Sequence, residues 1–164
     1  MTKLNLGGAW SKFDGFTSID LRKTPNVDIV GDIRDLKKLG FEDNSVEEIV
    51  AFHSLEHIPF METRKTIKQW YDIMKPGAKI TIACPDLDYL YSALDSGEID
   101  FDYFEQNLFG EFGGYWSMEQ DWHHAAFTKK SMKKLLEEAG FKSISFKPPR
   151  NEDYKYEFVV EALK

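Results

Sequence analysis

Residues 3–21 read KLNLGGAWSKFDGFTSIDL, and this stretch decides the fold class. A short apolar run is followed by two glycines, a brief polar connection and a second apolar run that ends in Asp20. Nucleotide-binding α/β folds begin in this way. The connection, residues 7–17, has barely enough residues for the helix that normally joins two parallel strands. The stretch therefore predicts a parallel α/β fold with an abbreviated first crossover.

The rest of the chain continues the alternation of short apolar segments with polar or helical ones, which is typical of a parallel sheet. We expect strands at residues 3–6, 18–21, 27–30, 46–52, 79–84, 143–147 and 156–163. The last two are joined by PPRNEDYK and should pair as a hairpin, so the final strand is predicted to run antiparallel to the others.

Two helices can be identified from their apolar spacing. In residues 61–77 the apolar side chains recur three or four positions apart, and a Pro-Gly pair follows as a stop signal. This face comprises Ile67, Trp70, Tyr71 and Met74. In residues 127–141, Thr128 is a suitable N-cap and Gly140 a suitable C-terminal residue.

Size and composition favour a single domain, residues 1–164, and with 42% hydrophobic residues the chain can build a core that covers both faces of the sheet. The net charge of −7 argues against a nucleic-acid partner, which requires a basic surface. No signal segment or long apolar span is present, so we expect a cytoplasmic protein with no membrane partner.

Residues 86–127 are rich in aromatic side chains and form a long insertion after a predicted strand. Long insertions at strand ends often carry function. We interpret this segment as a lid over a small-molecule acceptor, such as a sugar or an aromatic metabolite. Ordinary core packing or a homodimer contact is an equally good interpretation of its rings.

The glycine turn indicates which ligands the sheet edge could hold. Gly7 and Gly8 allow close approach of the backbone, Asp20 could accept hydrogen bonds from ribose hydroxyls, and Asp32 could meet an adenine amino group with Ile33 against the ring. A phosphate-binding G-x-G-x-x-G turn opening a long helix is missing, which disfavours NAD, FAD and ATP. S-adenosylmethionine carries a cationic sulfonium in place of phosphates, and an acidic, glycine-lined pocket suits it.

Several ordered motifs carry a family resemblance: LNLGGAW, VDIVGDIRDL, FEDNSVEEIVAFHSLEHI, WYDIMKPGAKITIACPD and HHAAFTKKSMKKLLEEAGF. Together they resemble the small, type-11-like class I S-adenosylmethionine-dependent methyltransferases. The resemblance implies a Rossmann-like, doubly wound, mostly parallel seven-stranded sheet with an antiparallel last strand. It also implies S-adenosylmethionine as cofactor and S-adenosylhomocysteine as product.

Carried over to this sequence, the resemblance implies a set of cofactor-binding residues. Those expected to contact the cofactor are Leu6, Gly7, Gly8 and Ala9 at the methionine part, Asp20 and Leu21 at the ribose, Asp32 and Ile33 at the adenine, and Phe52 and His53 closing the pocket. The family's usual G-x-G reads Gly7-Gly8-Ala9 here, so Ala9 replaces its last glycine. The Ala9 methyl group and the missing first helix favour an alternative function, that of a non-catalytic relative acting as a binding or scaffold module.

Methyl transfer needs mainly positioning of the acceptor, which contributes roughly 7–11 kcal/mol. A general base is needed only for a protonated acceptor, and we consider His53, His123, His124 and Asp86 as candidates for acceptor contact or proton transfer. An Asp at the start of a helix can equally be a cap. The four-residue spacing of His53 and His57 suits a metal on a helix, but no third ligand follows the known patterns, so we expect no metal.

Overall fold

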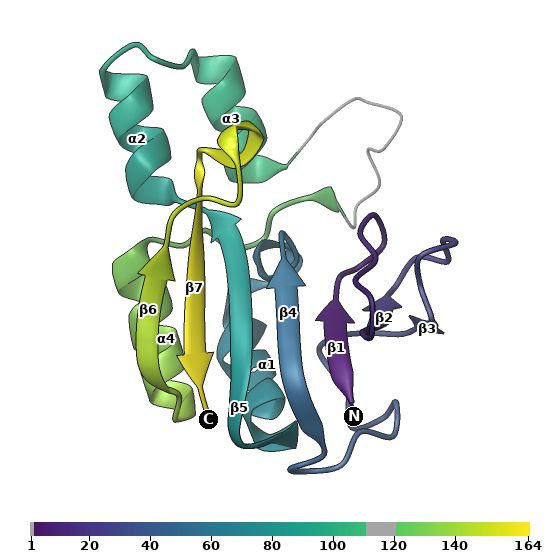
Figure 1. The fold of residues 1–164 in the computed structure, drawn as a ribbon. Coiled ribbons are helices and arrows are strands. Elements are labelled where there is room, and N and C mark those ends of the chain that lie inside the picture. The colour runs from purple at the N-terminus through teal and green to yellow at the C-terminus, as the bar shows by residue number, and fades with distance from the viewer. Residues whose placement is uncertain (1, 111–120) are drawn as a thin grey trace.

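The computed structural model describes residues 2–110 and 121–164 and contains a seven-stranded sheet in the order β3-β2-β1-β4-β5-β7-β6 (Figure 1). Its strands are β1 (Lys3–Leu6), β2 (Thr17–Asp20), β3 (Ile29–Val30), β4 (Val46–Phe52), β5 (Met74–Pro85), β6 (Lys142–Lys147) and β7 (Glu157–Leu163). The strands β1 to β5 pair in parallel, whereas β7 is antiparallel to both β5 and β6. The predicted α/β class and the antiparallel last strand are confirmed.

The helices are α1 (Phe60–Ile73), α2 (Leu87–Asp95), α3 (Phe101–Phe109) and α4 (Lys129–Ala139). Short 3₁₀ turns at Leu55–His57 and Glu152–Tyr154 follow β4 and precede β7. The predicted ends of α4 are confirmed: Thr128 and Ser131 form a reciprocal capping box, and Gly140 adopts the left-handed conformation after the last turn. The connection between β1 and β2 contains no helix, as its length predicted.

Three predicted boundaries were wrong: the end of the first helix and the start of the third strand by about two residues, and the start of the fifth strand by five. Helix α1 ends at Ile73, and Met74 already pairs with Val46 as the first residue of β5, so the Pro-Gly pair lies inside the strand and not at the helix end. Strand β3 has two residues, not four, and the Asp28 carboxylate accepts a 2.9 Å hydrogen bond from the Ser18 amide just before it. A side chain thus takes the place of a strand partner there.

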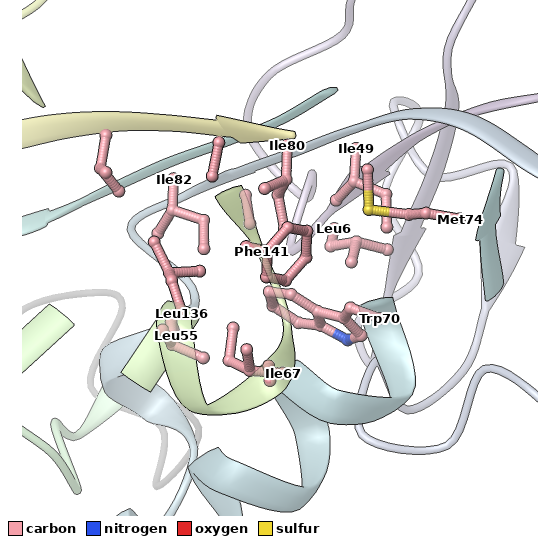
Figure 2. Close-up of a cluster of buried hydrophobic side chains, with 14 of the residues drawn as sticks. Leu6, Ile49, Leu55, Ile67, Trp70, Met74, Ile80, Ile82, Leu136 and Phe141 are labelled. Carbon is pink, nitrogen blue, oxygen red and sulfur yellow. The ribbon is translucent and has the colours of Figure 1, made fainter. Parts of the chain in front are cut away.

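The hydrophobic core lies between one face of the sheet and the helices α1 and α4 (Figure 2). Alternate strand residues point into it, for example Ile80 and Ile82 of β5, and they meet Trp70 of α1 and Leu136 of α4. Figure 1 shows both helices on the same side of the sheet. The segments that connect β1 to β4 contain no helix in residues 7–16, 21–28 and 31–45.

Part of the opposite face of the sheet carries a row of ion pairs. Lys79 on β5 lies 3.7 Å from Glu48 on β4 and 3.3 Å from Glu161 on β7, and these two glutamates pair in turn with Lys3 on β1 and Lys147 on β6. On the same face Val50, Ala83 and Val159 are buried, so apolar packing is present beside the ion pairs. The segments between β1 and β4 contain no helix to cover the ion pairs, and the charged side chains keep this part of the face compatible with water.

None of the helices in the described part of the chain is both long and apolar enough to span a bilayer.

Candidate functional site

The sheet order reverses between β1 and β4, and ligands of open α/β sheets bind beyond the carboxyl ends of the strands at such a point. Two adjoining depressions lie there, with about 420 Å³ and 680 Å³ of space counted to their open mouths. We call them together the strand-end hollow. The first is lined by Gly7, Asp20, Arg22 and His53, the second by Asp32, Arg34, Ile58, Pro59 and His124, and both by Leu21, Ile33, Ser54 and His57.

Gly7, the residue after β1, has a backbone conformation and a close neighbour that leave no room for a larger residue. Its φ of +75° lies in the left-handed region, and a Cβ atom on it would lie 2.3 Å from the Cβ of Ser54. Ser54 is 4% exposed, and its hydroxyl has no hydrogen-bond partner among the described residues. The hollow thus contains a buried polar atom that a ligand could satisfy.

Asp20, at the end of β2, is 5% exposed and faces the hollow. One carboxylate oxygen accepts hydrogen bonds from the amide (2.8 Å) and the guanidinium Nε (3.4 Å) of Arg22, and the other accepts one from the Ala9 amide (3.1 Å). A carboxylate has about four acceptor sites. One site therefore remains for a ligand hydroxyl, and a second becomes available if the long Arg22 contact is released.

Asp32, after β3, is more fully engaged. Arg34 donates to it from its amide and from its side chain through four hydrogen bonds of 2.7–3.0 Å. Burial by itself would raise the pKa of Asp32, but these bonds from Arg34 outweigh it and lower the pKa. Asp32 lines the hollow, yet it can accept a hydrogen bond from an adenine only after Arg34 has moved.

Four of the predicted cofactor residues do not line the hollow. Leu6 and Ala9 are completely buried, so the Ala9 methyl group does not narrow the depression. Gly8 is in close contact with Asn5, whose side-chain nitrogen would lie 2.3 Å from an added Cβ atom. The ring of Phe52 packs edge to face on Phe13 with the ring centroids 5.7 Å apart. The helix-free β1–β2 connection thereby covers the end of β4.

His53 links the hollow to the C-terminal strand. Its Nε2 lies 2.7 Å from a carboxylate oxygen of Glu157, and its Nδ1 lies 3.1 Å from Glu56. Burial by itself would lower the pKa of His53, but the two carboxylates raise it to about 9. Arg150 clamps the other side of Glu157 with side-chain contacts of 2.9–3.1 Å. With both ring nitrogens engaged, His53 is arranged to hold the site together and not to accept a proton.

The other candidate catalytic residues lie in three different environments. His124 is exposed and lines the hollow. The ring of His123 packs edge to face on that of His57, with 4.9 Å between centroids, away from the hollow. Asp86 caps α2, accepts a hydrogen bond from the Asp88 amide and pairs with Lys129 at 3.0 Å. Asp86 does not line the hollow, and its observed contacts are those of the cap interpretation.

The segment predicted as a lid contains α2 and α3, which stand beyond the carboxyl end of β5 (Figure 1). Residues of both helices line a further depression, which we call the α2–α3 depression. Among the residues lining it are Glu56, Leu87, Leu90, Asn107, Leu108 and His123. Three of the aromatic residues predicted for the lid, Phe112, Tyr115 and Trp116, lie outside the described residues.

Two residues that line the hollow, Arg22 and Arg34, are missing from the predicted site, although a short sequence pattern indicates them. Arg22 and Arg34 each follow an acid by two positions, as D-x-R, and this spacing lets the arginine fold back onto the carboxylate. Arg22 also reaches Asp121 at 2.5 Å. Nothing in the sequence pointed to Glu157 or Arg150, because their contacts with His53 and Phe52 cross about a hundred residues.

Comparisons with solved structures agree with this fold. An S-adenosylmethionine-dependent methyltransferase from Archaeoglobus fulgidus superposes with a TM-score of 0.68 at 13% identity, over 99% of this chain and 86% of its own. A possible histamine N-methyltransferase from Thermotoga maritima gives 0.62 at 11% identity, over 99% and 82%. A putative methyltransferase from Listeria monocytogenes gives 0.60 at 16% identity, over 99% and 90%.

A search of curated proteins found no match. The sequence model of the methyltransferase domain family matches residues 12–145, which is most of the chain. This match, together with the sheet order and the antiparallel last strand, confirms the predicted class I family. The chain belongs to the methyltransferase domain family.

Proposed function

We propose that the chain binds S-adenosylmethionine in the strand-end hollow and transfers its methyl group to a small-molecule acceptor. The observation that carries the proposal is the hollow itself. A buried carboxylate, Asp20, and a buried hydroxyl without a partner among the described residues, Ser54, face the same depression at the topological switch point. The family supplies the reaction, and the hollow supplies polar groups suited to a nucleoside.

The residues present fit the cofactor at the ribose and ring positions. Asp20 retains an acceptor site for a ribose hydroxyl, and the Ser54 hydroxyl can pair with a polar atom of the ligand. Leu21 and Ile33 line both parts of the hollow and offer apolar surfaces for an adenine ring. The bound cofactor supplies the electrophilic methyl group, and the protein contributes orientation and exclusion of water.

The acceptor is proposed to enter from the side of α2 and α3. His124 is the best placed of the predicted bases, because it lines the hollow and no hydrogen bond among the described residues engages its ring. A neutral imidazole there could take the proton of an acceptor hydroxyl or amine as the methyl group is transferred. We propose a cytoplasmic location for this reaction.

The first test is calorimetric titration with S-adenosylhomocysteine and S-adenosylmethionine. We expect Asp20→Asn to weaken binding of both at least about 10-fold, because a charged acceptor is lost from a buried site. Asp14→Asn is the matched control, since Asp14 is exposed in the same β1–β2 connection and does not line the hollow. A folded wild-type protein that binds neither ligand would refute the proposal.

One observation favours the alternative function, a binding module without catalysis. Asp20 accepts hydrogen bonds from Arg22, and Asp32 accepts four from Arg34, which fill all of its acceptor sites. Transfer of labelled methyl groups to a panel of hydroxyl, amine and thiol acceptors distinguishes the two functions. Turnover that is lost in His124→Ala supports the enzyme, whereas tight cofactor binding with no transfer to any acceptor supports the module.

A further inference from the structure

Three potential metal ligands converge beside the strand-end hollow. One ligand atom from each of Glu56, His57 and His123 lies within 4.8 Å of the other two. The first two belong to the 3₁₀ turn after β4, and the third lies near the end of the aromatic segment, residues 86–127. Backbone hydrogen bonds from His124 (2.8 Å) and Ala125 (3.0 Å) to the Glu56 carbonyl hold the two segments together.

Both imidazoles are oriented by backbone carbonyls. The Nδ1 atom of His57 lies 3.1 Å from the carbonyl oxygen of Trp122, and that of His123 lies 2.9 Å from the carbonyl oxygen of Asn107. A carbonyl oxygen only accepts, so each Nδ1 carries the proton and each Nε2 retains its lone pair. Histidine ligands of metal ions are oriented in this way, with the other ring nitrogen donating to a carbonyl or carboxylate.

Glu56 provides an independent observation that points to a cation. Its side chain is 1% exposed, and its Oε1 atom has no aligned hydrogen bond among the described residues. Its neighbour is the His53 imidazole, whose Nδ1 lies 3.1 Å away as an ion pair. The other oxygen of Glu56, Oε2, is approached by the Cys84 thiol at 3.5 Å, a weak donor. This buried carboxylate thus keeps acceptor sites that a metal ion could occupy beside the His53 ion pair.

We propose that Glu56, His57 and His123 bind one divalent transition-metal ion. Two imidazoles and one carboxylate form a ligand set suited to Zn²⁺ and its neighbours, and three protein ligands leave a position open. Ligand atoms in a tetrahedral zinc site are roughly 3.4 Å apart, so no pair here has to close by more than roughly 1.4 Å on binding. Small rotations of the two imidazoles, which are not fully buried, supply this movement.

The open position would lie between the two depressions. His57 lines the strand-end hollow, whereas Glu56 and His123 line the α2–α3 depression. An ion there could bind a hydroxyl, thiol or carboxylate oxygen that reaches the site from either side. Metal binding itself does not depend on the proposed methyl transfer.

The test is titration of the chelator-treated chain with Zn²⁺ by calorimetry and with Co²⁺ by visible absorption. We expect one ion per chain and a Co²⁺ absorption band of a four- or five-coordinate site, with no comparable binding of Mg²⁺. A wild-type chain that binds Zn²⁺ at less than one equivalent, or without a Co²⁺ band, overturns the proposal. Titration of the metal-free chain with S-adenosylhomocysteine tests cofactor binding separately. Failure of the metal proposal can therefore be distinguished from failure of the proposed function.

The variants His123→Ala and His57→Gln should each weaken Zn²⁺ binding at least about 100-fold, because each removes a ligand. His124→Ala is the matched control, since the neighbouring imidazole is outside the cluster, and it should retain affinity within about twofold. Circular dichroism identifies any variant that does not fold. In that case Glu56→Gln, which removes a ligand but preserves the side-chain size, is tested in place of the unfolded variant. Equal losses in the cluster variants and the control would also overturn the proposal.

Discussion

At the residue scale, Gly7 illustrates how the backbone and a neighbouring side chain jointly exclude any larger residue. Its positive φ would strain an L-residue, and the Cβ of Ser54 occupies the space that a methyl group would need. Gly15, in the same connection, has a similar φ of +80° but nothing within 4 Å of an added Cβ. A comparison of substitutions at the two glycines therefore distinguishes the cost of backbone strain from that of steric overlap.

We expect Gly15→Ala to lower the free energy of unfolding by about 1 kcal/mol through backbone strain alone. Gly7→Ala should cost a further 1–3 kcal/mol or so, because its methyl group overlaps the side chain of Ser54. It should also weaken S-adenosylhomocysteine binding, since Gly7 and Ser54 both line the hollow. Urea denaturation measures the difference, and equal losses in the two variants would contradict the steric explanation.

At the scale of elements, α4 is the helix whose sequence signals and observed ends agree best. Thr128 Oγ1 accepts a 3.1 Å hydrogen bond from the Ser131 amide, and the Ser131 hydroxyl is within 2.9 Å of the Thr128 amide. The capping box satisfies amide groups that the first turn leaves without partners. The cap acts locally, so its contribution can be measured without disturbing the site.

Thr128→Ala should lower the free energy of unfolding by about 1 kcal/mol, the usual cost of losing an N-cap side chain. Thr128→Ser keeps the hydroxyl and serves as the control, with a change below about 0.5 kcal/mol. Chemical denaturation of the three proteins measures this. If serine is as unfavourable as alanine, the threonine methyl group and not the cap is responsible.

At the scale of the whole molecule, a buried ionic cluster joins β7 to the strand-end hollow. Glu157 on β7 is contacted by His53, which lines the hollow, and by Arg150 from the preceding loop. His53 has a φ of +49°, which is unfavourable for a residue with a side chain and is sustained by its surroundings. The cluster thus links the last strand of the fold to the strand-end hollow.

We expect Glu157→Gln to lower the free energy of unfolding by about 2–4 kcal/mol, because it leaves two cations without their shared carboxylate. This is somewhat below the cost for a fully buried pair, since Arg150 and His53 are 27% and 24% exposed. Cofactor affinity should fall as well, because His53 lines the hollow.

Glu161→Gln, at a half-exposed position four residues further along the same strand, is the control, with a change below about 1 kcal/mol. Thermal unfolding and calorimetry test both effects. A loss of stability with unchanged affinity would show that the cluster does not shape the hollow.

The positions of the strands and of Asp20 could be predicted because they depend on local patterns. Apolar runs, glycines and caps specify elements through interactions between residues close in sequence. The helix end at Ile73 and the short β3 were missed because strand pairing and the Asp28 side chain override local signals there. The row of ion pairs on one sheet face could not be predicted, because composition gives the amount of apolar and charged surface but not where it is placed.

The histidines show the same division. Their presence in HSLEH and DWHHAAF marked them as candidates, but sequence spacing paired His53 with His57. In the folded chain His53 forms a hydrogen bond with Glu157. The ring of His57 packs against that of His123, which lies 66 positions further along the sequence. Which charges become buried together depends on how distant segments pack, and no local pattern records that.

By itself, the sequence determined the α/β class, the shortened first crossover and the two acids at the strand ends, because each follows from short-range chemistry along the chain. Only the tertiary structure decided that His53 and Arg150 enclose Glu157, that part of one sheet face carries ion pairs, and that Glu56, His57 and His123 meet. These arrangements depend on contacts between segments far apart in sequence, whose distances and burial exist only once the sheet has formed.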